Sequence, residues 1–169
     1  MMAPIKSVLF VCTANICRSP MAEAFFKNRI AEIQERTDWR IESAGTWALE
    51  GVPASYNTQV IMQELGLDLS GHRSRCVSRE IIGSFSLILT MERGHKEALQ
   101  VEFPKYADRI FLLSEMAGVV RDIRDPYGST LLDYRESARE IDDYLTRGFA
   151  RINQLAQANA TPYSSAGSE

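Results

Sequence analysis

Apolar and polar positions along this chain follow two patterns, one typical of buried strands and the other of amphipathic helices. Continuous or alternating apolar runs predict strands over residues 5–11, 39–44, 85–90 and 109–113. Apolar positions at helical spacing predict helices over residues 19–35, 57–65, 92–101 and 131–157. Gly148 interrupts the last of these only mildly. Residues 45–53 and 118–130 have the composition of loops.

The alternation of strands with helices indicates βαβ units and therefore an α/β fold. We expect three layers, α/β/α, with a central four-stranded parallel sheet that is covered on both faces. A length of 169 residues suits one domain, which we place at residues 1–158. Residues 159–169 are rich in Ser and Ala and are predicted to form a disordered tail.

The composition disfavours several classes of protein. A net charge of −3 argues against non-specific binding of nucleic acid. No apolar run is long enough to cross a bilayer, so we expect no membrane insertion. Residues 1–6 lack the apolar core of a signal peptide, and the three cysteines make an odd number. Both observations favour a reducing, cytoplasmic compartment and reactive rather than structural thiols.

The segment that starts at Cys12 carries the clearest chemistry. Cys12 directly follows the first predicted strand, at the edge of the sheet where ligands bind, and Arg18 follows after five residues. This spacing lets a loop curl round an anion, with Arg18 offering a planar fork to two phosphate oxygens. The thiolate is the form of Cys12 that attacks. It is favoured by the backbone N–H groups of the loop, by Arg18 and by the N-terminus of the next helix. Ser19 is suited either to cap that helix or to donate to the sulfur. On spacing alone, a buried core cysteine remains an alternative.

Four segments together resemble one known family. The run VCTANICRSPMAEAFF, from Val11 to Phe26, is similar to the N-terminal signature of the low-molecular-weight protein tyrosine phosphatases. Residues 43–46 (SAGT), 69–75 (LSGHRSR) and 125–128 (DPYG) resemble later segments of the same family. The resemblance implies hydrolysis of phosphotyrosine through a phosphocysteine intermediate, without a metal or other cofactor. It also implies binding of phosphate-like anions and a phosphotyrosine-containing protein as partner, a tyrosine kinase being one candidate.

The resemblance implies roles for three groups that carry the reaction. Cys12 would be the nucleophile, and Arg18 would bind the phosphoryl oxygens and stabilise their charge in the transition state. Asp125 would protonate the leaving phenolate and then act as base towards water. From the residues alone, Asp122 competes with Asp125, because Asp-Pro is also a common turn signal.

The other family positions fall into three sets. The phosphate-binding loop would comprise Thr13, Ala14, Asn15, Ile16, Cys17 and Ser19. Asn15 and Ser19 would form a bracing hydrogen-bond network with Ser43 and His72, while Trp47 and Tyr127 would be walls of the substrate cleft. Cys17 would form a reversible disulfide with Cys12 under oxidation. From the residues alone, a core position is an alternative for Trp47. His95 matches no position of the family pattern, and we expect it to be exposed.

Two positions in the loop bear on geometry and substrate. Ala14 stands where many family members carry glycine, and a left-handed backbone there would cost alanine about 1–2 kcal/mol. We therefore expect a strained or slightly different loop at Ala14. Family members that act on phosphoarginine tend to carry Thr at the position of Ile16, so Ile16 favours phosphotyrosine.

Three other functions remain as alternatives. A phosphoarginine phosphatase would share the loop. An arsenate reductase would need two further cysteines to relay a disulfide, and only Cys76 lies outside the loop. A non-catalytic phosphate-binding module would not require Cys12, Arg18 and Asp125 together.

Overall fold

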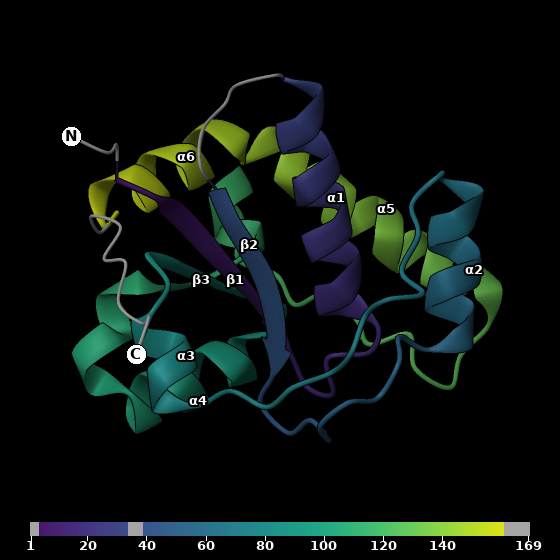
Figure 1. Cartoon of the computed structure of the whole chain (residues 1–169), viewed down its shortest axis with the longest axis horizontal. Helices are drawn as coiled ribbons and strands as arrows, with labels where there is room; N and C mark the ends of the chain where they lie inside the picture. Colours follow the sequence, from purple (N-terminus) through teal and green to yellow (C-terminus); the bar gives the residue numbers. More distant parts are fainter. Residues whose placement is uncertain (1–3, 34–38, 161–169) are drawn as a thin grey trace, which may run out of the picture.

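The computed structural model describes residues 4–33 and 39–160, which form a parallel sheet with helices on both faces (Figure 1). The elements are β1 (Lys6–Cys12), α1 (Arg18–Glu32), β2 (Trp39–Gly45), α2 (Tyr56–Glu64), α3 (Arg79–Gly83), β3 (Leu87–Thr90), α4 (Arg93–Glu102), η1 (Pro104–Arg109), β4 (Ile110–Leu112), η2 (Ser114–Ala117), α5 (Leu131–Arg147) and α6 (Phe149–Ala158). The strand order is β2-β1-β3-β4, and every pairing is parallel. The α/β class and the four-stranded parallel sheet are therefore confirmed.

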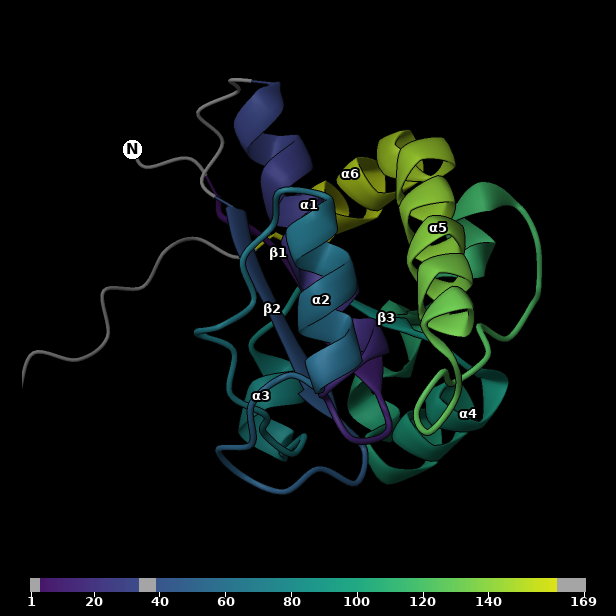
Figure 2. The ribbon, with the colours of Figure 1, turned by 90° about the vertical axis from the view of Figure 1, so that its right-hand side faces the viewer.

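Each face of the sheet has its own hydrophobic core. Val8 and Phe10 of β1 pack in a cluster with residues of α1, α5 and α6. Leu9 and Val11 point to the opposite face, into a cluster with residues of α3 and α4. Figure 2 shows α1, α5 and α6 together on one side of the strands. Burial on both faces explains why the strands read as continuous apolar runs in the sequence.

The C-terminal region corrects one prediction. Residues 131–157 form two helices, α5 and α6, and not one, because the chain turns at Gly148. A Cβ atom at Gly148 would lie 2.5 Å from the Cβ of Met116 and 2.7 Å from the carbonyl oxygen of Tyr144. The glycine is therefore required by the close approach of η2, a contact that helical spacing does not reveal.

One short helix was not predicted, and one prediction is not tested. The sequence did not predict α3, a five-residue helix that begins where the Ser78 hydroxyl accepts from the N–H of Ile81, because it is too short to show a period. The tail at residues 159–169 stays a prediction, since 161–169 lie outside the described residues.

The strands end together at one edge of the sheet. Cys12 pairs in register with Gly45 on β2, and Val11 pairs with Thr90 on β3. Loops that follow β1, β2, β3 and β4 therefore meet beyond this edge, and parallel α/β sheets bind their ligands at such edges.

Candidate active site

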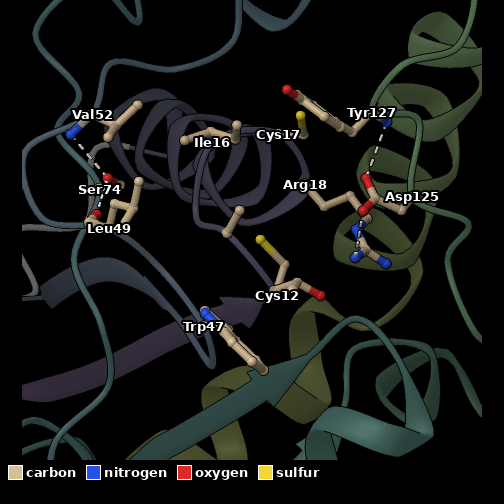
Figure 3. Close-up of a pocket in the computed structure, with 12 residues that line it drawn as sticks. Cys12, Ile16, Cys17, Arg18, Trp47, Leu49, Val52, Ser74, Asp125 and Tyr127 are labelled. Carbon is tan, nitrogen blue, oxygen red and sulfur yellow. Dashed lines mark hydrogen bonds and ion pairs between the residues drawn. The ribbon is translucent and has the colours of Figure 1, made fainter.

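A cleft of about 380 Å³ opens beyond the carboxyl edge of the sheet. It is lined by Cys12, Thr13, Ala14, Ile16, Cys17, Arg18, Trp47, Leu49, Val52, Ser74, Asp125 and Tyr127. The Cys12 sulfur lies between Trp47 on one side and the Arg18–Asp125 pair on the other (Figure 3). Trp47 is 84% exposed, so it is a wall of the cleft and not a core residue. The cleft thus joins a thiol and a guanidinium to an apolar rim.

Asn15 is the centre of the network behind the loop. Its side-chain N–H₂ donates to the hydroxyls of Ser19 and Ser43, both at 2.9 Å, and its Oδ1 accepts from the N–H of Arg75 at 3.0 Å. Its carbonyl oxygen lies 2.7 Å from His72 Nε2, which must carry the proton because a carbonyl only accepts. The structure thus brings together Asn15, Ser19, Ser43 and His72, the four residues expected to brace the loop.

The left-handed backbone in this loop lies at Asn15 and not at Ala14. Asn15 has φ 58° and is the one non-glycine residue with positive φ among the described residues. Asparagine adopts this conformation more readily than alanine. The expected strain at Ala14 is therefore wrong.

Gly45 allows the loop to rest on the end of β2. A Cβ atom there would lie 2.4 Å from the Thr13 carbonyl oxygen and 3.0 Å from the Asn15 nitrogen. The sequence placed Gly45 in a family segment but did not indicate this contact.

Ser19 is hydrogen-bonded to the sulfur of Cys12, with 2.9 Å between Oγ and Sγ. Because Asn15 donates into the Ser19 oxygen, the hydroxyl proton is left for another acceptor. The carbonyl of Ala44 is farther, at 3.5 Å. The N-cap of α1 is Cys17, so Ser19 lies inside the helix. Of the two roles expected for Ser19, the geometry supports the one at the sulfur.

Arg18 is a buried cation with three partners from two segments. Its side chain is 2% exposed, its Nη1 donates to the Ile123 carbonyl at 2.7 Å, and Glu92 Oε2 lies 3.0 Å away. Its Nη2 lies 3.6 Å from Asp125 Oδ2. A buried guanidinium requires such partners, and they hold it in one orientation towards the cleft. The sequence did not single out Glu92, which lies two residues after the third predicted strand.

The structure distinguishes the two candidate acids. Asp125 lines the cleft, and its Oδ1 accepts from the N–H of Tyr127 at 3.1 Å. Asp122 Oδ1 instead accepts from the backbone N–H of Arg93 at 2.8 Å, a bond that lowers the pKa of this carboxyl and caps α4. Ile123, fully buried between them, anchors the loop through its N–H to Met91. Of these two carboxyl groups, Asp125 is therefore the one that faces the cleft.

Cys17 shares the cleft with Cys12 but has different surroundings. Its sulfur lies 3.3 Å from the Ser55 hydroxyl and 3.7 Å from that of Tyr134. Burial raises the pKa of the Cys17 thiol, and burial also raises the pKa of Tyr134 to about 12, so both groups are protonated at neutral pH. Cys76 lies outside the cleft, beside Gly45, with its sulfur 3.9 Å from the Thr46 carbonyl.

Mild peroxide is expected to link Cys12 to Cys17. Oxidation of Cys12 to the sulfenic acid would leave the Cys17 thiol as the group that condenses with it. Peptide mass spectrometry should find this disulfide, with activity restored by added thiol. Cys76→Ser should behave as the wild type, whereas Cys17→Ser should be inactivated irreversibly. A disulfide between Cys12 and Cys76 would contradict this expectation and revive the redox alternative.

The groups around the cleft suit an anion better than a cation. The N-terminus of α1 begins at Arg18, so the helix dipole and a guanidinium meet at the same point. Within residues 4–33 and 39–160, no three His, Cys, Asp or Glu side chains are grouped to hold one metal ion.

Comparison with known proteins agrees with this geometry. The model of the family "Low molecular weight phosphotyrosine protein phosphatase" matches residues 7–158. The chain belongs to this family. This confirms the resemblance drawn from the sequence.

Similar proteins in this family have two named activities. A protein-arginine-phosphatase of Geobacillus stearothermophilus is 35% identical over 141 residues, which cover 83% of this chain and 91% of that protein. A probable low molecular weight protein-tyrosine-phosphatase, EpsP, of Ralstonia nicotianae is 33% identical over 151 residues, 89% of this chain and 99% of the relative. Among solved structures, a low molecular weight protein tyrosine phosphatase from T. tengcongensis has a TM-score of 0.81 and 38% identity, covering 86% of this chain and 98% of its own.

Proposed function

We propose that this protein hydrolyses phosphotyrosine in proteins through a phosphocysteine intermediate. The observation that carries the proposal is the meeting of Cys12, Arg18 and Asp125 in one cleft, with Trp47 and Tyr127 at its walls. A nucleophile, a fixed cation and an acid are the three groups that transfer of a phosphoryl group from a phenol requires.

The first step forms the intermediate. Arg18 and the loop bind the three terminal phosphoryl oxygens, and the Cys12 thiolate attacks phosphorus in line with the leaving oxygen. The S–P bond forms as the P–O bond breaks, and Asp125 gives its proton to the departing phenolate. Arg18 stabilises the charge that spreads over the phosphoryl oxygens.

The second step uses the same groups in reverse. Asp125, now a carboxylate, takes a proton from a water molecule whose oxygen attacks phosphorus. The S–P bond breaks and its electron pair returns to Cys12. The Ser19 hydroxyl, 2.9 Å from the sulfur, donates to the thiolate as it leaves.

The apolar lining of the cleft supports an aromatic substrate. Ile16, Trp47 and Tyr127 line it and offer surface that a phenyl ring covers. Phosphoarginine is the second candidate, because a 35% identical relative is named a protein-arginine-phosphatase. Its guanidinium would need polar partners, and the Ile16 side chain cannot supply one.

A panel of phosphorylated substrates tests the proposal. Phosphotyrosine peptides are expected to be hydrolysed with a kcat/KM at least about 100-fold above phosphoserine and phosphoarginine peptides. A mismatched polar guanidinium in an apolar site costs roughly 3 kcal/mol, and phosphoserine has no ring to cover the apolar walls. Arsenate with thiol serves as the redox arm. Preferred turnover of phosphoarginine, or reduction of arsenate, would overturn the assignment.

Asp125→Asn is expected to slow hydrolysis of phenyl phosphate by about 10²–10³-fold, because it removes the proton donor and phenolate is a poor leaving group. Aryl phosphates with acidic phenols need little protonation and should be affected far less. A series of substituted phenyl phosphates measures this dependence. Asp122→Asn is the matched control and should leave the dependence on the leaving group unchanged. An equal effect of Asp125→Asn on all the esters would contradict its role as acid.

The partner we propose is a protein that carries phosphotyrosine, with a tyrosine kinase as one candidate. The compartment we propose is the cytoplasm, which suits three free cysteines. None of the helices that the structure describes has the length and apolar character to cross a membrane.

A further inference from the structure

His95 is buried beside the phosphate loop, which corrects the expectation that it is exposed. It lies in the first turn of α4 and is 7% exposed. Its Nε2 lies 2.8 Å from the Thr13 hydroxyl and 3.3 Å from Glu92 Oε2. Its Nδ1 is buried without a hydrogen-bond partner in the described part of the chain. This histidine thus contacts the residue next to Cys12, although it does not itself line the cleft.

Glu92 links His95 to the buried guanidinium. The same oxygen that faces His95, Oε2, lies 3.0 Å from Arg18 Nη1. Glu92 is the N-cap residue of α4, but the first N–H of that helix is capped from another loop, by Asp122. The carboxylate of Glu92 is therefore available to both Arg18 and His95.

The contacts determine which nitrogen of His95 carries the proton. A lone pair on Nε2 would face the Glu92 carboxylate at 3.3 Å and be repelled, so Nε2 is the protonated nitrogen and donates to the Thr13 hydroxyl, while Nδ1 is bare. Burial and the nearby Arg18 lower the pKa of His95 from 6.5, against the opposing effects of Glu92, Asp125 and Asp122. A second proton would sit on Nδ1, for which the described residues offer no acceptor, so the neutral form of His95 is favoured.

We propose that His95 is a positioning residue of the phosphate site, whose Nε2–H donates to the Thr13 hydroxyl beside Cys12 and lies against the Glu92 carboxylate that pairs with Arg18. The loop and the guanidinium come from β1 and α1, whereas His95 and Glu92 come from the segment after β3. The cluster thus joins the two halves of the anion site. The inference rests on the proposed function only in so far as turnover is one of its readouts.

Two amide substitutions separate this role from packing. His95→Gln places an amide N–H₂ near the position of Nε2, whereas His95→Asn places it near Nδ1, where the part of the chain that the structure describes offers no partner. We expect His95→Gln to retain most of the wild-type kcat/KM at every pH above 6.5. His95→Asn should lose about 10- to 100-fold in kcat/KM, as misplacement of a reacting group by about 1 Å does. His95→Asn should also weaken the binding of inorganic phosphate, which calorimetry measures. Glu97→Gln, at an exposed position on the same helix, is the control and should match the wild type.

The outcomes distinguish a positioning role of His95 from a packing role and from proton transfer. If His95→Gln and His95→Asn lose activity equally, His95 is a packing residue and the inference is overturned. The same conclusion follows if neither variant changes phosphate affinity while both lower the melting temperature. If Gln loses turnover but not phosphate affinity, His95 transfers a proton and the inference is also wrong. Nitrogen-15 NMR of the wild-type protein at pH 7 should show His95 protonated on Nε2, and protonation on Nδ1 would contradict it. A wild type that binds phosphate but does not hydrolyse phosphotyrosine overturns the proposed function while leaving the affinity and NMR tests valid.

Discussion

Cys12→Ser is expected to abolish turnover, lowering kcat by at least about 10⁴-fold, as loss of a nucleophile does in other covalent enzymes. Serine has the shape of cysteine, but its hydroxyl is a far weaker nucleophile in the absence of an adjacent base. The hydrogen bond from Ser19 stabilises a thiolate, and it is too weak to generate an alkoxide. Steady-state assays with phosphotyrosine peptide measure the loss.

The same variant should still bind phosphate, because Arg18 and the loop remain. Calorimetric titration with inorganic phosphate checks this, and acid-quenched mass spectrometry of the wild type should find a phosphorylated Cys12 peptide. Cys76→Ser is the matched control, since that thiol lies outside the cleft, and it should retain full activity. Substantial turnover by Cys12→Ser would exclude the phosphocysteine mechanism.

Arg18→Lys should have the second largest effect, a fall in kcat/KM of about 10³-fold, because transition-state charge is stabilised by donors in fixed positions. Lysine keeps the positive charge but offers one compact ammonium in place of a planar fork. It also cannot reach the Ile123 carbonyl, Glu92 and Asp125 together, which the guanidinium contacts at 2.7, 3.0 and 3.6 Å. Phosphate affinity should fall along with kcat.

Circular dichroism must show Arg18→Lys folded at the assay temperature, because Glu92 and the buried Ile123 carbonyl are left poorly paired. Arg151→Lys, at an exposed position on α6, is the control for the exchange itself and should be silent. If Arg18→Lys kept a tenth or more of the wild-type kcat/KM, charge alone would suffice and the fork would be unnecessary.

Strands and the phosphate loop could be predicted because their signals are local. Burial of β1 on both faces requires a continuous apolar run, and a loop that wraps an anion requires its cysteine and arginine at a short, constant spacing. The family segments around Ser43, His72 and Asp125 added residues distant in sequence, and the structure brings all three to the same edge of the sheet. Their roles in the reaction stay predictions until the variants are measured.

Other features depend on contacts that no local pattern records. The break between α5 and α6 arises because η2 packs against Gly148, and Gly45 is required because the loop rests on β2. The choice between Asp122 and Asp125 depends on which carboxyl group caps α4 and which faces the cleft. Strain expected at Ala14 is absent because its neighbour Asn15 takes the left-handed conformation.

By itself, the sequence determined the α/β class and the family and singled out the segment predicted to bind an anion, because apolar period and motif spacing are properties of neighbouring residues. Only the tertiary structure decided that Trp47 is a wall of the cleft, that Glu92 pairs with Arg18 and that His95 is buried against Thr13. These positions follow from three loops meeting at one edge of a parallel sheet. Burial, and with it the protonation state of a group such as His95, is set by what the other segments place around it.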